Sequence, residues 1–130
     1  MTEWHSIDSK EHIVEISYAK KGNAILRDFP SEAVPGQTIS GQVGVKNTNS
    51  IVGIMTFHLE LYEVRLGPDK LLGRYYPYYD EEQGKWVWSD DSKKWTAAYV
   101  DAGKEFVLSA AIKVPTISKL KIKVIAWAYY

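Results

Sequence analysis

The sequence predicts an all-β fold, an antiparallel immunoglobulin-like β-sandwich of about seven to nine strands. Three observations lead to this prediction. Apolar and polar residues alternate along several short segments, as they do in a strand with one buried face. Turns rich in glycine, proline and aspartate separate these segments at intervals of roughly eight to twelve residues. No segment holds an apolar period of about 3.6 residues over three turns, so we expect little helix.

The first two predicted strands are short. Residues 13–18 contain isoleucine, valine and tyrosine and end before a Lys-Lys-Gly-Asn turn, which predicts a first strand. Residues 24–29 predict a short edge strand. Pro30 ends it, because proline has no N–H to donate to a neighbouring strand.

Two longer strands follow. Residues 37–48 come after a turn at Pro35 and Gly36, and their apolar residues occupy every second position. Residues 51–66 are the best candidate for a central core strand, because the odd positions form an apolar face. The apolar residues of that face are Ile51, Met55, Phe57, Leu59 and Leu61.

The region of residues 70–100 is less regular. Turn-forming residues at 80–84 and 90–92 divide it into short pieces. The segments at residues 85–89 and 94–99 predict two short strands that form a hairpin across the second turn.

Regular alternation returns in the last part of the chain. Residues 106–114 place apolar side chains at even positions, and Pro115 ends that strand. Residues 118–130 predict the last strand, with apolar residues facing inward and lysines facing outward. The inward residues are Leu120, Ile122, Val124 and Ala126, and the lysines are Lys119, Lys121 and Lys123.

Composition limits the range of functions. The 130 residues include 16 basic and 16 acidic side chains, so no overall positive field attracts nucleic acid or anionic lipid. Cysteine is absent, which excludes disulfides and thiolate chemistry. No apolar run approaches the roughly 18 residues of a membrane span, and the first residues lack the pattern of a secretory signal. Either the protein is not secreted through a cleaved signal, or the chain begins after one.

The length predicts one domain over residues 1–130. The first thirty residues leave alternatives open. Residues 1–30 belong to this domain, extend from it, or complete the sheet of a neighbouring copy as an exchanged strand, since an open sheet edge can accept an extended segment.

Four segments carry a family resemblance. They are the Pro-Gly turn and strand at residues 35–48, Phe-His-Leu-Glu-Leu-Tyr at 57–62, Ala-Gly-Lys-Glu-Phe at 102–106 and Ile-Lys-Val-Ile-Ala at 122–126. Together they resemble the cell-adhesion-related bacterial domain (CARDB) family, an immunoglobulin-like fold found mainly in bacterial and archaeal surface proteins. The same residues resemble, more faintly, the N-terminal sandwich of arrestin-like proteins. The resemblance implies an immunoglobulin-like fold, and a function only by analogy.

Aromatic residues are concentrated between residues 74 and 99. Trp86 and Trp88 share one face of a predicted strand, where they can present a flat platform to sugar rings. Two other interpretations remain open: the block packs over an open end of the sandwich, or it forms a protein interface. The candidate binding residues are Tyr76, Tyr78, Tyr79, Trp86, Trp88 and Trp95.

The C-terminal strand becomes apolar on both faces from Val124 onward. Ile125, Trp127 and Tyr129 continue the face that carries the lysines, so we expect something to cover them. The cover is either the N-terminal segment of the same chain or a neighbouring subunit. In the second case these three residues form an oligomer interface.

No catalytic, metal-binding or cofactor motif stands out, so we expect no enzyme activity, no metal and no cofactor. Acidic residues at 80–82 and 90–91 fit solvated loops better than a calcium site, because they lack the ligand spacing of a calcium loop. The three histidines have no metal-ligand spacing, and His58 is interpreted as a satisfied surface or rim histidine. The alternating lysines before Val124 fit an exposed strand that resists aggregation better than a nucleic-acid site.

The sequence therefore predicts a non-catalytic structural, assembly or adhesion module that acts through protein–protein contacts. The leading interpretation is self-assembly, as in a virion, filament or surface layer, with a virion or extracellular location favoured over the cytoplasm. The alternative is a carbohydrate-binding module with an aromatic platform. The expected partners are copies of the chain or other protein subunits, or else a glycan, with no nucleic acid and no membrane span.

Overall fold

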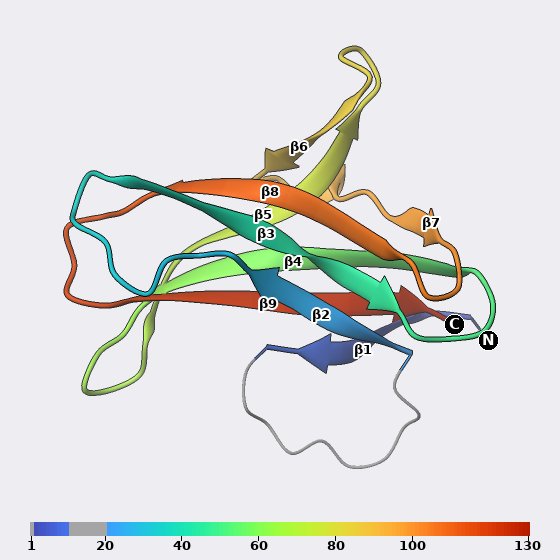
Figure 1. Cartoon of the computed structure of the whole chain (residues 1–130), viewed down its shortest axis with the longest axis horizontal. Helices are drawn as coiled ribbons and strands as arrows, with labels where there is room; N and C mark the ends of the chain where they lie inside the picture. The colour runs from blue at the N-terminus through green and yellow to red at the C-terminus, as the bar shows by residue number, and fades with distance from the viewer. Residues whose placement is uncertain (1, 11–20) are drawn as a thin grey trace.

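The residues that the structure describes form two antiparallel sheets that pack face to face (Figure 1). The computed structural model describes residues 2–10 and 21–130, and the predicted strand at residues 13–18 lies outside them. Within the described residues there are nine strands and one short 3-10 helix, and every strand pairing is antiparallel. The prediction of an all-β, antiparallel protein is confirmed.

The larger sheet contains six strands. In spatial order five of them are β1 (Trp4–Ser9), β9 (Leu120–Tyr129), β4 (Gly53–Glu63), β5 (Lys70–Asp80) and β6 (Lys85–Ser89). The sixth strand, β7 (Ala98–Val100), pairs with the beginning of β4. The centre of this sheet is β4, which confirms its prediction as the central core strand.

The smaller sheet contains three strands, in the order β2 (Gly22–Arg27), β3 (Thr38–Asn47) and β8 (Glu105–Lys113). As predicted, β2 is an edge strand. The turn before β3 contains Gly36 at a φ of 85°, a backbone conformation that glycine adopts without strain.

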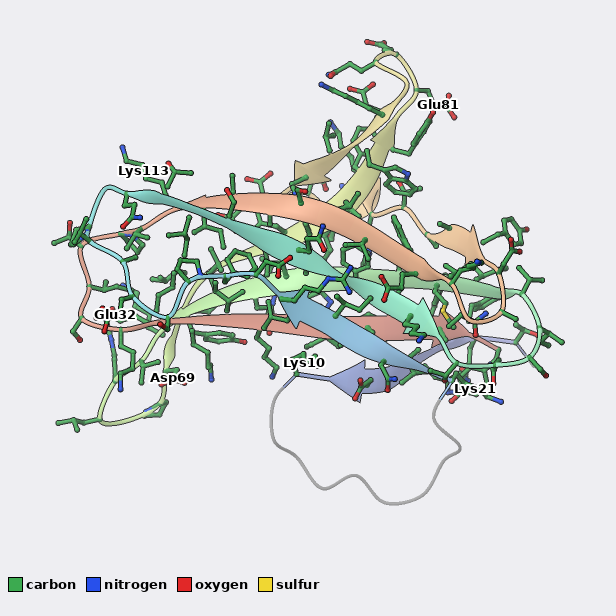
Figure 2. The ribbon with its side chains drawn as sticks, in the orientation of Figure 1. Lys10, Lys21, Glu32, Asp69, Glu81 and Lys113 are labelled. Carbon is green, nitrogen blue, oxygen red and sulfur yellow. The ribbon has the colours of Figure 1, made fainter. Side chains whose placement is uncertain are left out.

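The hairpin of β5 and β6 projects from the two-layered body, and Glu81 marks its tip (Figures 1 and 2). The first half of β5 pairs with β4, and the second half leaves β4 and pairs with β6. The segment of residues 95–97 fills the resulting gap. The backbone N–H of Thr96 donates to the Pro77 carbonyl oxygen at 2.9 Å, and the Thr56 hydroxyl donates to the Thr96 carbonyl oxygen at 3.0 Å.

The predicted hairpin between residues 85–89 and 94–99 is wrong. The hairpin turn is the one at residues 80–84, where the N–H of Gly84 donates to the Asp80 carbonyl oxygen at 2.8 Å and Gly84 has a φ of 66°. After β6 the chain forms the 3-10 helix Ser92–Lys94 and then returns to β4 through the contacts of Thr96. The strand after this segment therefore pairs with β4 and not with β6.

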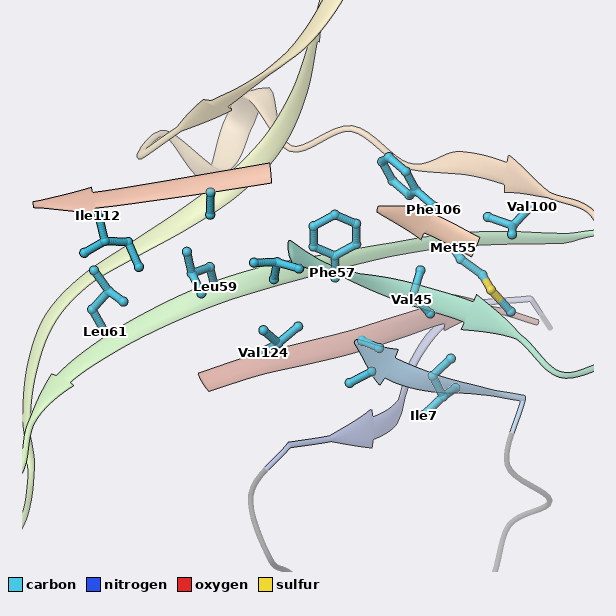
Figure 3. Packing of buried hydrophobic residues seen from close by; sticks show 14 of the residues in the cluster. Ile7, Val45, Met55, Phe57, Leu59, Leu61, Val100, Phe106, Ile112 and Val124 are labelled. Carbon is cyan, nitrogen blue, oxygen red and sulfur yellow. The ribbon is translucent and has the colours of Figure 1, made fainter. Parts of the chain in front are cut away.

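The hydrophobic core lies between the two sheets and draws on both (Figure 3). Met55, Phe57, Leu59 and Leu61 of β4 point into it, which confirms the predicted inward face at these four positions. The prediction is wrong for Ile51, which precedes β4 and is 70% exposed. The most completely buried side chains include Val43, Val45, Met55, Phe57 and Val124. The predicted inward face of β9 is confirmed at Val124 and Ala126.

The described N-terminal residues pair within the same chain. β1 lies along β9, and Glu3 and Tyr130 exchange two backbone hydrogen bonds of 3.1 Å. Ile7 of β1 contributes to the core. Glu3, near the start of the chain, and the C-terminal Tyr130 consequently lie beside each other. β1 and the end of β9 are neighbours in Figure 1. The described part of the chain contains no helix long and apolar enough to cross a membrane.

Candidate binding site

The outer face of the larger sheet, which points away from the smaller sheet, carries a row of large side chains. Tyr99 of β7, Ile54 of β4, Tyr129 of β9 and Trp4 of β1 are consecutive register partners. Directly paired residues project to the same face of a sheet, so these four side chains form one row across four strands. Tyr99 is 79% exposed, and Trp4 and Tyr129 are also exposed. We call this row the aromatic row.

A pocket lies next to the aromatic row. Its volume is about 250 Å³, and three of its walls are indole rings. The indoles belong to Trp4, Trp95 and Trp127, and the remaining lining residues are Thr56, Ser92 and Ala97. The Trp95 and Trp127 rings stand nearly perpendicular, with an interplanar angle of 84° and centroids 6.1 Å apart. We call this site the tryptophan pocket.

Hydrogen bonds to the sheet hold two of the three indoles. The Trp95 Nε1–H donates to the Thr56 hydroxyl at 2.7 Å and to the Phe57 carbonyl oxygen at 3.0 Å. The Trp127 Nε1–H donates to His58 Nδ1 at 3.0 Å. Since an indole has only one donor, these two rings offer no free N–H to a ligand. The tryptophan pocket is therefore a rigid and mainly apolar site.

A buried polar network lies beneath Trp127. His58 and Glu60 are only 7% and 5% exposed, although both lie on the outer face of β4. His58 Nε2 lies 3.1 Å from Glu60 Oε2, and the Arg74 Nε–H donates to the same oxygen at 2.7 Å. The Tyr62 hydroxyl donates to Glu60 Oε1 at 2.7 Å. We call these contacts the Glu60 network.

The Glu60 network holds a neutral imidazole beside a charged carboxylate. Burial lowers the pKa of His58, and the hydrogen bond to Glu60 opposes this effect without cancelling it. Burial alone would raise the pKa of Glu60, but hydrogen bonds from Tyr62, Arg74 and His58 outweigh burial and lower this pKa to about 2. Both ring nitrogens of His58 have partners, so the side chain links Trp127 to Glu60. His58 has hydrogen-bond partners, as predicted, but its predicted place at the surface or rim is wrong, because the side chain is buried.

The six aromatic residues predicted as a binding platform do not share one surface. Tyr76 and Trp95 lie on the outer face, where their rings are 4.9 Å apart. Tyr78 follows on that side, with the Lys94 ammonium 5.4 Å from its ring centroid. Tyr79, Trp86 and Trp88 lie on the opposite face of the hairpin.

Trp86 and Trp88 share a face, as their spacing predicts, but that face points toward the core. The centroid of the Trp86 ring lies 4.7 Å from that of Phe106, and the centroid of the Trp88 ring lies 6.0 Å from that of Phe57. The Trp88 Nε1–H donates to the Ser109 carbonyl oxygen of β8 at 2.9 Å. These two indoles therefore join the projecting hairpin to the smaller sheet.

A second, more open depression lies along the hairpin. It has a volume of about 850 Å³, and its lining includes Tyr78 on one face of the hairpin, Tyr79 and Trp86 on the other, and the acidic residues at 80–82. Asp80 also has a local role, because its carboxylate accepts backbone N–H groups of the turn that follows it. We call this depression the hairpin groove. The described residues contain no group of three or more histidine, cysteine, aspartate or glutamate side chains arranged to hold a metal.

The predicted interface residues Ile125, Trp127 and Tyr129 all lie on the outer face of β9. Part of their cover comes from the same chain. Trp4 of β1 contacts Tyr129 at 4.9 Å between ring centroids, and Trp95 packs against Trp127. Tyr129 stays exposed, so the cover is incomplete.

Sequence reasoning missed Trp4, Ile54 and Tyr99 as candidate site residues. Trp4 and Ile54 stand in segments whose local pattern gives no sign of a site, whereas Tyr99 ends the aromatic block of residues 74–99 without being among the candidates chosen from it. The three residues meet only through strand pairings between distant parts of the chain. Comparison of the chain with protein-family models, curated proteins and solved structures gives no match. Function is therefore inferred from the geometry of this face.

Proposed function

We propose that this chain is a non-catalytic assembly module whose partner is a second copy of itself, bound through the outer face of the larger sheet. One observation carries the proposal. The same face holds a projecting side chain, Tyr99, and a recess that fits an apolar side chain, the tryptophan pocket. A contact surface rich in tyrosine and tryptophan is typical of protein interfaces.

A projecting side chain (the knob, Tyr99) and a recess (the tryptophan pocket) on the same face favour a symmetric dimer. When two copies meet face to face across a two-fold axis, each can place its Tyr99 in the tryptophan pocket of the other. Tyrosine suits this pocket because its ring can stack on the indoles while its hydroxyl stays at the wetter rim, near Ser92. The two fixed indoles add to the affinity, because they lose little freedom on binding.

The wider setting is also part of the proposal. We propose that the two sheets form an immunoglobulin-like sandwich related to CARDB domains, with arrestin-like sandwiches as a fainter relation. Such a module would act as a structural component of a virion, filament or cell surface. Two antiparallel sheets around one core and the absence of cysteine are compatible with this role.

The first test is the molar mass in solution over a concentration series, measured by light scattering after size exclusion. We expect a concentration-dependent dimer for the unchanged chain and a monomer for Tyr99→Ser, because the variant removes the knob without altering the core. Leu66→Ser is the matched control. Leu66 is fully exposed in the loop between β4 and β5, at the opposite end of β4 from Tyr99, and its replacement should leave the dimer intact.

Two outcomes would contradict the dimer. One is a monomeric mass for the unchanged chain at every concentration. The other is a dimer that persists in Tyr99→Ser, which would place the contact elsewhere on the molecule.

Carbohydrate binding is a second candidate, and the hairpin groove favours it. The lining of the groove includes both aromatic and acidic residues. Aromatic rings stack on sugars, and carboxylates bond sugar hydroxyls. Titration with soluble polysaccharides should then change the tryptophan fluorescence of the unchanged chain, and Tyr79→Ala should weaken the response. Unchanged fluorescence with every polysaccharide would rule this candidate out.

A further inference from the structure

We infer that His58 is an acid-sensitive positioning residue, and that protonation of its ring releases Trp127 from the wall of the tryptophan pocket. The inference rests on the proposed function in one respect only, that the pocket receives a side chain of a second copy. The geometry of the Glu60 network carries the rest.

The hydrogen bonds of His58 define which nitrogen holds the proton. An indole Nε1–H can only donate, so His58 Nδ1, at 3.0 Å from it, must be an unprotonated acceptor. The single proton of the neutral ring is then on Nε2, where it is donated to Glu60 Oε2 at 3.1 Å. Trp127, His58 and Glu60 thus form a series of hydrogen bonds in which each donor meets an acceptor.

A second proton on the His58 ring breaks the hydrogen bond between Trp127 and His58. It binds at Nδ1, which then becomes a donor that faces the Trp127 donor. Rotation of the ring does not solve the conflict, because both nitrogens of a charged imidazole are donors and one still faces the indole. Because His58 is buried, two donors left without an acceptor are costly, and movement of the indole relieves the cost.

The charged and titratable groups around His58 come from three strands. Glu60 of β4 favours the charged ring, whereas Arg74 of β5 and Lys123 of β9 oppose it. The ring of Tyr76 on β5 lies 5.8 Å from the imidazole. Burial has the largest effect and lowers the pKa of His58 below 6.5. The imidazole is therefore neutral at pH 7 and gains its charge only in acid.

Two further neighbours of His58 are walls of the tryptophan pocket. The Trp127 ring stacks near the imidazole at 6.1 Å between centroids, and the Trp95 ring meets it edge-on at 5.4 Å. Movement of Trp127 therefore changes the shape of the recess that would hold Tyr99. We expect acid to weaken self-association as His58 becomes charged.

The decisive experiment follows the indole N–H and imidazole signals by ¹⁵N NMR during a pH titration. It uses the Tyr99→Ser chain, so that the result does not depend on self-association. The Trp127 signal is identified by its loss in Trp127→Phe. We expect the Trp127 indole signal to shift with the same midpoint as the His58 ring nitrogens, while the Trp86 and Trp88 signals stay constant.

Two variants separate positioning from a general effect of acid. In His58→Gln the amide oxygen can accept from Trp127 but cannot titrate, so the Trp127 signal should lose its pH dependence. In Trp127→Phe the donor that favours the neutral ring is gone, so His58 should titrate at a higher pH than in the chain with tryptophan. The second variant tests the coupling even where the first does not fold.

A Trp127 signal that stays constant through the titration of His58 would overturn the inference. So would an Nδ1-protonated imidazole at neutral pH. Neither result would affect the dimer measured by light scattering. A chain that is monomeric at every pH would instead remove the proposed function and leave the coupling of His58 to Trp127 in place.

Discussion

Truncation of Phe57 to alanine is expected to lower the free energy of unfolding by about 3–5 kcal/mol, the cost of emptying a buried aromatic site. Phe57 has no exposed surface and lies at the centre of β4. Its ring contacts Phe106 of the smaller sheet at 4.9 Å and Trp88 of the projecting hairpin at 6.0 Å, between centroids. One side chain thus joins both sheets and the hairpin, and the surroundings cannot easily collapse into the space it leaves.

Urea denaturation at neutral pH measures this loss, with Leu66→Ala as the matched control. Leu66 is fully exposed, so its truncation should change the free energy of unfolding by no more than about 0.5 kcal/mol. A loss below about 1 kcal/mol for Phe57→Ala would mean that the ring is not packed between the sheets.

The position of Phe57 could be predicted from the sequence, and the reason is local. Residues of a strand alternate between two faces, so the apolar residues Met55, Phe57, Leu59 and Leu61 mark a buried face without knowledge of what buries them. The same reasoning holds for Val124 and Ala126 on β9. The alternation of apolar residues along a strand can be recognised without knowing which other strand packs against it.

The other face of β4 could not be predicted in this way. Thr56, His58 and Glu60 read as a polar, solvated face, yet all three are buried. Thr56 and His58 accept hydrogen bonds from Trp95 and Trp127, which are 39 and 69 positions away along the chain. Glu60 accepts from Arg74 of β5. Burial of a polar face depends on distant residues that supply both the cover and the hydrogen bonds, and no local pattern records it.

The projecting hairpin shows a related limit. The spacing of Trp86 and Trp88 predicts correctly that they share a face, but a period of two does not tell which face points inward. The long strand β5 also escaped prediction, because it changes partners midway and contains Pro77, which usually marks a strand edge. The sequence indicates Trp95, Trp127 and Tyr129 as separate candidates. That they lie on the same face of the larger sheet as Trp4 and Tyr99 follows only from the strand pairings.

Acid is expected to remove the stability that the Glu60 carboxylate provides. The pKa of Glu60 in the folded protein is about 2, below its ordinary value of 4.5. A group whose pKa is lowered by folding stabilises the fold above its unfolded pKa, and this contribution disappears as the pH falls from about 4.5 to about 2. With allowance for solvent screening, it amounts to about 2–3 kcal/mol. The lowered pKa of His58 also makes the fold less stable in acid, and this loss of stability begins near pH 6.5.

Glu60→Gln isolates the contribution of this carboxylate. At pH 6 the variant should be less stable than the unchanged chain by about 3 kcal/mol, because the buried His58 and the partly buried Tyr62 keep donors that have lost a charged acceptor. At pH 2 the difference should nearly vanish, since a protonated glutamate resembles glutamine. Urea denaturation at several pH values measures both.

The control for this comparison is Glu63→Gln on the same strand. Glu63 pairs with Arg65 at the surface, at 2.9 Å, and an exposed ion pair contributes less than about 1 kcal/mol. If Glu60→Gln were equally destabilising at pH 6 and pH 2, the loss would come from shape and not from charge. A difference that closes with falling pH identifies the ionised carboxylate as the group that holds β4 to the side chains of β5, beneath the wall of the tryptophan pocket.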